Sequence, residues 1–303
     1  MKRSAIGFAL AGLAGCVSRA PVPAPLRPFE HVFFGMGTVW RVEGLAPASL
    51  DAPALREALS RRVLEDELLF SDWSEESELR RLERGGLAEW RPASPRFLKL
   101  LDLSAEAWRE SRGVFDPTIG AVQWKALARP VGLGAMERRE GEFRFREDPR
   151  RLTFGGIAKG FSVGALGELL VARGFRHFRV NGGGGNLLLR AETGAEPWPE
   201  LLAYGLEAEA LWHVSRSRTA RPETSKGAKA SQHIYDPRDP RRALNEAATL
   251  LCRQRLERDL ESEAALSDAA SKALVVEPEA PVPPHCRGVK APLEAPAKPV
   301  LQR

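Results

Sequence analysis

Two glycine-rich runs are the first places in this sequence where backbone groups could do chemistry. Residues 155–160 read GGIAKG and include Lys159, and residues 181–186 read NGGGGN. Neither run is a P-loop or a dinucleotide-binding fingerprint, because the first lacks the terminal Gly-Lys-Ser/Thr and a strand rather than a helix follows the second. Both nevertheless expose backbone N–H groups at the ends of elements, where an anion can be held. A purely structural role as tight turns stays open for each run.

A second chemical feature is the segment SDAASKAL at residues 267–274. Asp268 is followed three and four residues later by Ser271 and Lys272, so a helix would present these side chains on one face. Carboxylate and hydroxyl oxygens are donors that Mg²⁺ prefers, so such a face could hold a metal ion. The alternative is that Asp268 is an exposed capping residue.

The third feature is His233, the first residue of HIYDPR at residues 233–238. An imidazole could deprotonate a hydroxyl group, or it could be a structural histidine whose neighbours satisfy it. A hydrolase triad of Ser231, His233 and Asp236 does not fit, because nothing around Ser231 resembles a nucleophile elbow.

Helices and strands must position these groups, and the hydrophobic spacing predicts where they lie. Amphipathic helices are expected at residues 54–68, 75–84, 95–112 and 158–173. Strands are expected at residues 31–42 with a break at 35–37, and at 151–154, 175–180 and 187–189. Ser74 is expected to cap the second helix, with Ser77 close behind. The pattern indicates one soluble domain that contains both helices and strands.

The composition is that of a folded domain with a mixed surface. Apolar residues make up 43% of the 303 residues, and the net charge of +5 comes from basic residues interleaved with acidic ones, as in residues 56–84. Such interleaving is typical of a solvated surface and argues against nucleic-acid binding. Besides Cys16, the chain has Cys252 and Cys286, which could form one bridge, although the sequence alone does not decide it.

The N-terminus predicts export. Lys2 and Arg3 precede a short apolar run at residues 5–13, and Leu-Ala-Gly leads directly into Cys16. The run is too short to span a bilayer and has the flanks of a cleavable signal. Its end resembles the bacterial lipobox, in which the cysteine is lipidated. We therefore expect a signal peptide at residues 1–15 and a lipid anchor at Cys16, which would hold the protein in the cell envelope facing the periplasm. An ordinary signal peptide with an incidental cysteine is the alternative.

Two flanking segments are expected to lack regular structure. Residues 16–28 read as an extended Pro/Ala linker. Residues 277–303 are rich in proline, alanine and charge, and such a tail cannot bury enough apolar surface to order itself. The folded domain is therefore expected at residues 29–276.

Further short segments accompany these groups in a fixed order along the chain. The whole set is MGT at residues 36–38, SDW at 71–73, GVFDPTIG at 113–120, GGIAKGF at 155–161, NGGGGN at 181–186, HIYDP at 233–237 and SDAASKAL at 267–274. Their order and spacing resemble the ApbE family, the FAD-dependent protein FMN transferases once described as thiamine-biosynthesis lipoproteins. The resemblance spans residues 30–276, and GVFDPTIG and GGIAKGF are its most specific parts.

The resemblance implies a single flavin-binding domain of the α+β class, with mixed sheets and flanking helices. It also implies that FAD is bound as a substrate together with Mg²⁺, that the FMN moiety passes to a Ser or Thr hydroxyl of an exported partner protein, and that AMP is released. By position, the residues that would line the flavin dinucleotide are Met36, Trp73, Val114, Phe115, Asp116, Thr153, Lys159, Gly184 and Gly185. The residues that would face the metal are Gly156 through its carbonyl, Asp268 and Ser271. His233 and Asp268 would be the catalytic residues.

Four positions depart from the family pattern. Lys272 stands where relatives usually have Thr, Thr153 and Gly164 stand where they usually have Asp, and Trp73 stands where they usually have Tyr. Trp73 keeps an aromatic face for stacking. The ammonium group of Lys272 would compete with a divalent cation, and it would pair either with Asp268 or with the pyrophosphate itself. Three hypotheses therefore stay open: an active FMN transferase, a degenerate relative that binds FAD without transfer and, as a minor third, a hydrolase that releases FMN and AMP from FAD.

Overall fold

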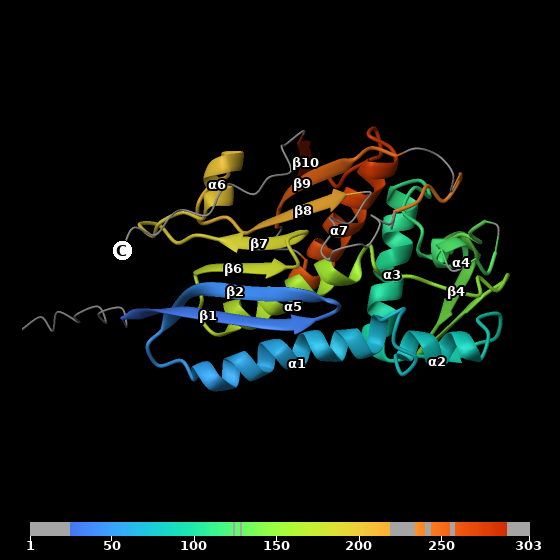
Figure 1. Ribbon diagram of the computed structural model, residues 1–303, viewed down its shortest axis with the longest axis horizontal. Coiled ribbons are helices and arrows are strands. Elements are labelled where there is room, and N and C mark those ends of the chain that lie inside the picture. The colour runs from blue at the N-terminus through green and yellow to red at the C-terminus, as the bar shows by residue number, and fades with distance from the viewer. Residues whose placement is uncertain are drawn as a thin grey trace, which may run out of the picture.

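The computed structural model describes residues 25–123, 125–127, 129–218, 234–239, 244–254 and 258–289. These residues form two sheets with helices packed on them (Figure 1). The predicted α+β class is confirmed. All strand pairs among the described residues are antiparallel, so the sheets are not mixed as expected.

The larger sheet has seven strands in the order β1-β2-β6-β7-β8-β9-β10. They are β1 (Leu26–Gly35), β2 (Thr38–Pro47), β6 (His177–Gly182), β7 (Asn186–Arg190), β8 (Trp212–Arg218), β9 (Ala247–Arg253) and β10 (Cys286–Val289). The strand predicted at residues 31–42 is a hairpin, because Met36 and Gly37 both adopt left-handed backbone conformations, with φ of 48° and 70°, and reverse the chain. β1 begins at Leu26, so the end of the predicted linker belongs to the sheet.

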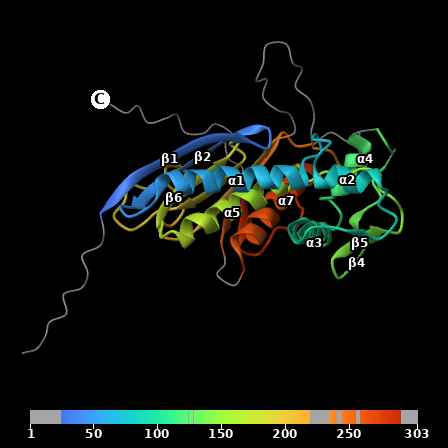
Figure 2. The same cartoon turned by 90° about the horizontal axis from the view of Figure 1, so that it is seen from below.

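Three helices cover one face of this sheet, α1 (Ala52–Phe70), α5 (Ala158–Ala172) and α7 (Leu260–Val276) (Figure 2). α1 presents Leu55, Leu59 and Val63 at four-residue spacing, and all three are fully buried in the core beneath β1 and β2. The opposite face carries α6 (Pro199–Tyr204) (Figure 1). The helices predicted at residues 54–68 and 158–173 are therefore confirmed.

A second group of elements packs at one end of the large sheet (Figure 1). It contains the sheet β3-β5-β4, with β3 (Arg91–Pro92), β5 (Glu142–Phe145) and β4 (Met136–Arg139), the helices α2 (Glu78–Arg84), α3 (Pro95–Glu110) and α4 (Gly120–Gln123), and 3-10 turns at Pro117–Ile119 and Leu133–Ala135. The predicted start of α2 is wrong, because Ser77 rather than Ser74 caps it by accepting a hydrogen bond from the N–H of Arg80 at 3.1 Å.

The strand predicted at residues 151–154 is not formed. The N–H of Leu152 donates instead to Oε1 of Glu83 at 2.7 Å, and the N–H of Thr153 donates to the carbonyl of Pro117 at 2.9 Å. A side chain and a loop therefore satisfy this backbone, and the segment leads straight into the glycine turn before α5.

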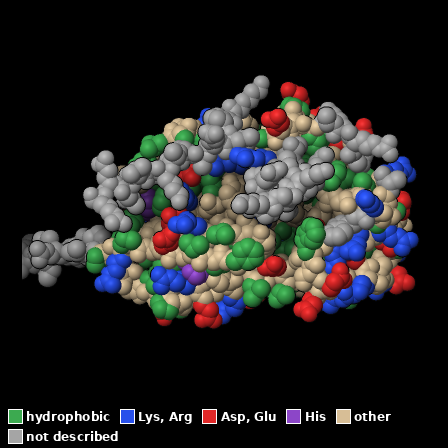
Figure 3. Space-filling model, viewed as in Figure 1, with side chains coloured by type: hydrophobic (Ala, Val, Ile, Leu, Met, Phe, Trp, Pro, Cys, Tyr) green, Lys and Arg blue, Asp and Glu red, His purple; other side chains and the backbone are tan. Residues whose placement is uncertain are grey.

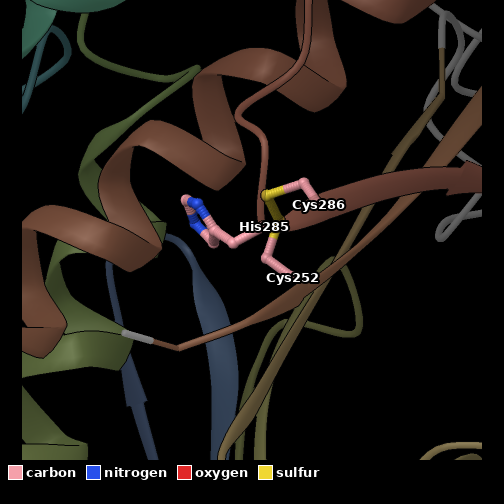
Figure 4. Close-up of side chains that lie close together, drawn as sticks. All are labelled: Cys252, His285 and Cys286. Carbon is pink, nitrogen blue, oxygen red and sulfur yellow. A yellow bond between two sulfur atoms is a disulfide. The ribbon is translucent and has the colours of Figure 1, made fainter. Parts of the chain in front are cut away.

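The expectation of a disordered tail is wrong for residues 277–289. β10 pairs with β9 at the edge of the large sheet, and Cys286 forms a disulfide with Cys252 (Figure 4). Strand pairing and a covalent bond order this segment, which has little apolar surface of its own. Residues 1–24 and 290–303 lie outside the described residues, so the predicted signal peptide and Cys16 do as well. Within the described ranges, no helix is long and apolar enough to cross a membrane.

Replacing Cys286 by serine should lower the free energy of unfolding by about 3–4 kcal/mol, the loop-closure value for a crosslink between residues 34 apart in sequence. Urea denaturation of both proteins, with and without a reductant, measures the effect. The reductant should destabilise the wild-type protein by the same amount and leave the variant unchanged. Equal midpoints for the two oxidised proteins would contradict the expectation.

Candidate active site

Asp268 is the centre of the candidate site, and it lies in the middle of α7 rather than at a helix end. Its side chain is fully buried, and Oδ2 accepts a hydrogen bond of 3.0 Å from the N–H of Gly160 in the first turn of α5. The two helices can approach this closely because residue 160 is glycine, since a Cβ there would lie 2.5 Å from the Cβ of Asp268. The GGIAKG run and the acidic helix, 108 residues apart in sequence, therefore meet.

Lys272 forms an ion pair with Oδ1 of the same carboxylate, and its side chain is 15% exposed. Ser215 on β8 donates a further hydrogen bond to Oδ1 at 3.2 Å. Burial would raise the pKa of Asp268, but the positive charges of Lys272 and Lys159 outweigh burial and hold that pKa below its ordinary value. Asp268 is therefore ionised, and two lysines supply its countercharge.

A layer of hydroxyl groups continues from this ion pair towards the sheet. Ser271 Oγ donates to the carbonyl of Asp268 at 2.8 Å and shares hydrogen bonds of 2.8 Å and 2.7 Å with the hydroxyls of Ser215 and Ser217. The two β8 serines were not among the site residues expected from the sequence. The signal that could have found them is the polar alternation of WHVSRSR at residues 212–218, which places His213, Ser215 and Ser217 on one face of a strand.

The glycine turn at residues 155–156 lies beside these groups. A Cβ on Gly156 would lie 3.0 Å from the ring of Phe115 and 3.5 Å from Cγ of Lys272, so the turn, the GVFDPTIG segment and α7 converge here. Thr153 Oγ1 donates to Oδ2 of Asp72 at 2.8 Å and accepts from the N–H of Gly155 at 3.3 Å. A carboxylate is therefore present beside residue 153, although it comes from the SDW segment.

Trp73 and Met36 border this region. The Trp73 side chain is 73% exposed, and its loop is held by Arg80, whose guanidinium donates twice to the carbonyl of Asp72 at 3.0 Å and 2.6 Å. The N–H of Met36 donates to Glu67 Oε2 at 2.9 Å, and its sulfur lies 3.5 Å from Oγ of Ser162 in α5.

The other residues predicted for the site lie in several different segments of the chain. Val114 and Asp116 are buried, and Asp116 caps the turn after it by accepting from the N–H and the hydroxyl of Thr118 at 2.9 Å and 2.8 Å. Burial raises the pKa of Asp116 to about 6, although the Thr118 hydrogen bonds oppose the rise. Gly184 and Gly185 lie in the turn between β6 and β7, where the N–H of Gly184 donates to Asn181 Oδ1 at 2.7 Å. His233 lies outside the described residues.

One other group of possible metal ligands occurs in the described part of the chain, formed by Cys252, His285 and Cys286 (Figure 4). The two sulfurs are bonded to each other, and Nε2 of His285 lies 2.6 Å from a carboxylate oxygen of Glu263 in α7. In this oxidised form the group is a crosslink beside a polar contact, and it is not a metal centre.

Comparison with known proteins places the chain in a family. The sequence model of the ApbE family matches residues 36–282. The chain belongs to the ApbE family. The glycine turns, the GVFDPTIG segment and Asp268 all fall within the matched range, so the family resemblance of the motifs is confirmed.

Two curated relatives carry the name FAD:protein FMN transferase. The Klebsiella pneumoniae protein is 31% identical over 120 residues, which cover 39% of this chain and 34% of that protein. The Rhodobacter capsulatus protein is 27% identical over 308 residues, which cover 89% of this chain and 55% of that protein. The chain therefore spans no more than 55% of the length of either relative.

Solved structures show the same ApbE fold. The flavin transferase ApbE of Vibrio cholerae gives a TM-score of 0.64 at 18% identity, covering 82% of this chain and 87% of that one. The apo form of the Pseudomonas stutzeri flavinyl transferase ApbE gives 0.62 at 16% identity, covering 84% and 87%.

The magnesium ion that the ApbE resemblance implies does not fit the residues present. Ser271 is hydrogen-bonded to Asp268 within α7, and Gly156 lies beside the side chain of Lys272. However, both carboxylate oxygens of Asp268 already accept hydrogen bonds, and one of them pairs with Lys272. Ser271 Oγ is hydrogen-bonded to three oxygens. The Lys272 ammonium contacts the Asp268 oxygen that a metal ion would need. The positive charges of the ammonium and of a metal ion would repel each other strongly in this buried site.

His213 on β8 is an unexpected member of this neighbourhood. It is fully buried, and neither ring nitrogen has a hydrogen-bond partner among the described residues. Burial lowers the pKa of His213 to about 4, the charge of Asp268 opposes this shift, and the charge of Lys272 adds to it. His213 is therefore a neutral imidazole in the folded protein at neutral pH.

The His213 imidazole should make folding sensitive to mild acid. The unfolded chain binds a proton at His213 below pH 6.5, whereas the folded chain does so only near pH 4. The free energy of unfolding therefore keeps its full value above pH 6.5 and decreases as the pH falls towards 4. At 1.36 kcal/mol per pKa unit the loss reaches about 3 kcal/mol. Urea denaturation from pH 7.5 to 4.5 should show a shallower decline for His213→Leu than for the wild-type protein. Parallel curves would contradict this assignment.

Proposed function

We propose that this chain is an FAD:protein FMN transferase, which moves FMN from FAD to a Ser or Thr hydroxyl of an acceptor protein and releases AMP. Membership of the ApbE family and the names of the curated relatives support the reaction class. The observation that carries the proposal is the contact between Asp268 and the N–H of Gly160, which brings Lys159, Lys272 and the turn at residues 155–156 together at the start of α5.

The reaction exchanges one phosphoester for another. The acceptor hydroxyl oxygen attacks the phosphorus on the FMN side of the pyrophosphate, the bond from that phosphorus to the bridging oxygen breaks, and AMP leaves with the electron pair. The hydroxyl proton is lost to a base. Negative charge builds on the bridging oxygen, where positively charged side chains and the N–H groups of a helix N-terminus stabilise it. Lys159 and Lys272 are the cationic groups proposed for this role.

Two predicted residues have roles that belong to this proposal. His233 is proposed as the base that takes the hydroxyl proton. Trp73, with its exposed indole, is proposed to stack on a ring of the dinucleotide.

We further propose that the chain is lipid-anchored at Cys16, faces the periplasm and modifies an exported acceptor. The lipobox-like sequence before Cys16 supports this location, and the disulfide between Cys252 and Cys286 supports it independently, because such bonds persist in oxidising compartments. Expressed in a bacterium, the wild-type chain should sediment with membranes and Cys16→Ser should not. Equal membrane association of both would exclude the anchor.

Incubation of the purified chain with FAD and a threonine-containing acceptor peptide tests the activity. AMP, measured by chromatography, should appear in equal amount to fluorescent flavin bonded to the peptide, and a peptide with alanine for threonine should receive none. Lys159→Ala should slow AMP release. Lys99→Ala should not, because Lys99 pairs instead with Asp259 and Glu261 at the start of α7. AMP without peptide labelling would indicate a hydrolase. FAD binding without AMP would indicate a binding protein.

A further inference from the structure

The Lys272 ammonium lies at an oxygen that the family resemblance assigns to a metal ion. Lys272 pairs with the carboxylate oxygen that would be a metal ligand, and its stem passes the turn at Gly156. It therefore occupies one of the oxygens that the family resemblance assigns to a cation, beside the turn that carries another. The ammonium is itself a cation, fixed to the chain.

The surroundings of Asp268 hold this ammonium in place. Asp268 is fully buried and ionised, so it needs a countercharge from a neighbouring group. The remaining hydrogen bonds to its oxygens come from a backbone N–H and a serine hydroxyl, which carry no charge. Removing Lys272 to admit a metal ion would break the closest ion pair of that carboxylate.

A second lysine lies close to the same carboxylate. Lys272 and Lys159 both act on Asp268 through their positive charges. A pyrophosphate held at the start of α5 would meet these ammonium groups, which bind phosphate oxygens as charge-assisted donors.

We propose that the Lys272 ammonium takes the place of a divalent cation in this chain, so that FAD binding and FMN transfer need no added metal. The part that concerns FAD rests on the proposed function. The part that concerns the metal does not, because it follows from the Asp268–Lys272 pair alone.

The first experiment measures metal binding to the ligand-free protein. Titration with Mn²⁺, followed by the loss of its free electron-spin-resonance signal, should show no saturable site in the wild-type chain. Lys272→Thr should create one site, and adding Asp268→Asn should remove it again. Saturable binding by the wild-type protein that Asp268→Asn abolishes would overturn the proposal. Thermal denaturation checks that each variant is folded, and if Lys272→Thr does not fold, the wild-type titration decides alone.

The second experiment measures FAD affinity by flavin fluorescence, in EDTA and in excess Mg²⁺. The wild-type affinity and rate of AMP release should be the same in both. Lys272→Thr should lose roughly tenfold in affinity in EDTA, the effect of one charge-assisted hydrogen bond, and should regain it with Mg²⁺. Lys272→Arg should stay indifferent to the metal, as should the matched control Lys99→Thr.

The outcomes separate this inference from the proposed function. Transfer by the wild-type chain that stops in EDTA and returns with Mg²⁺ would overturn the inference and leave the transferase in place. Absence of FAD binding under every condition would overturn the transferase and the FAD part of the inference, and the Mn²⁺ titration would still decide the metal part.

Discussion

Replacing Asp268 by alanine is expected to lower the free energy of unfolding by about 3–5 kcal/mol, the usual consequence of removing one partner of a buried ion pair. The substitution leaves Lys272 without its carboxylate, and it removes the acceptor for the N–H of Gly160 and for Ser215. FAD-dependent AMP release should also be lost, because α5 and α7 no longer present the two lysines together. Urea denaturation and the AMP assay measure the two effects.

A double variant separates charge from packing. Asp268→Ala combined with Lys272→Leu removes both members of the pair, so it should recover much of the stability that Asp268→Ala loses and none of the activity. A single variant with the same unfolding midpoint as the wild-type protein would show that the Asp268–Lys272 pair contributes nothing to folding.

Replacing Gly164 by alanine is expected to destabilise the protein by about 3 kcal/mol, at the upper end of the range for overpacking a tight contact. A Cβ at this position would lie 2.5 Å from the carbonyl carbon of Leu260 and 2.6 Å from Cα of Glu261. Both contacts are backbone atoms of α7, which move only if the helix moves. The same displacement would shift Asp268, so the AMP-releasing activity should fall as well.

Gly155 offers a matched control in the same part of the chain. A Cβ there would meet only Oγ1 of Thr153, at the ordinary distance of 3.4 Å, so Gly155→Ala should leave the free energy of unfolding within about 0.5 kcal/mol of the wild-type value. Gly164→Asp, which restores the residue usual in relatives, should be at least as destabilising as Gly164→Ala. A stable Gly164→Asp protein would contradict the packing argument.

The sequence predicted the long helices and the meeting of its motifs well, because both depend on strong local signals. α1 and α5 follow apolar spacing over many residues, and the glycine turns mark where α5 begins. The convergence of Gly156, Phe115 and Asp268 was expected only through the family resemblance, since no spacing rule relates residues so far apart.

The expectations that were wrong depend on contacts between residues that are far apart in the sequence. Residues 277–289 order themselves through a disulfide and a strand partner that are contributed by β9. Gly164 was interpreted as a lost carboxylate, whereas the structure shows a position that packing reserves for glycine. The pairing of Lys272 with Asp268 was one of two open alternatives, and the geometry of α7 shows that this pair forms.

The separation between Gly160 and Asp268 has a consequence for the newly made chain. The first turn of α5 acquires its carboxylate partner only after 108 further residues have been added, and a second contact, from Arg96 to Glu261, spans 165 residues. Contacts of such high sequence separation form late and slowly in folding. A newly made chain that still lacks α7 therefore has no carboxylate partner for the start of α5, so the proposed FMN transfer would begin only after α7 has been made and packed.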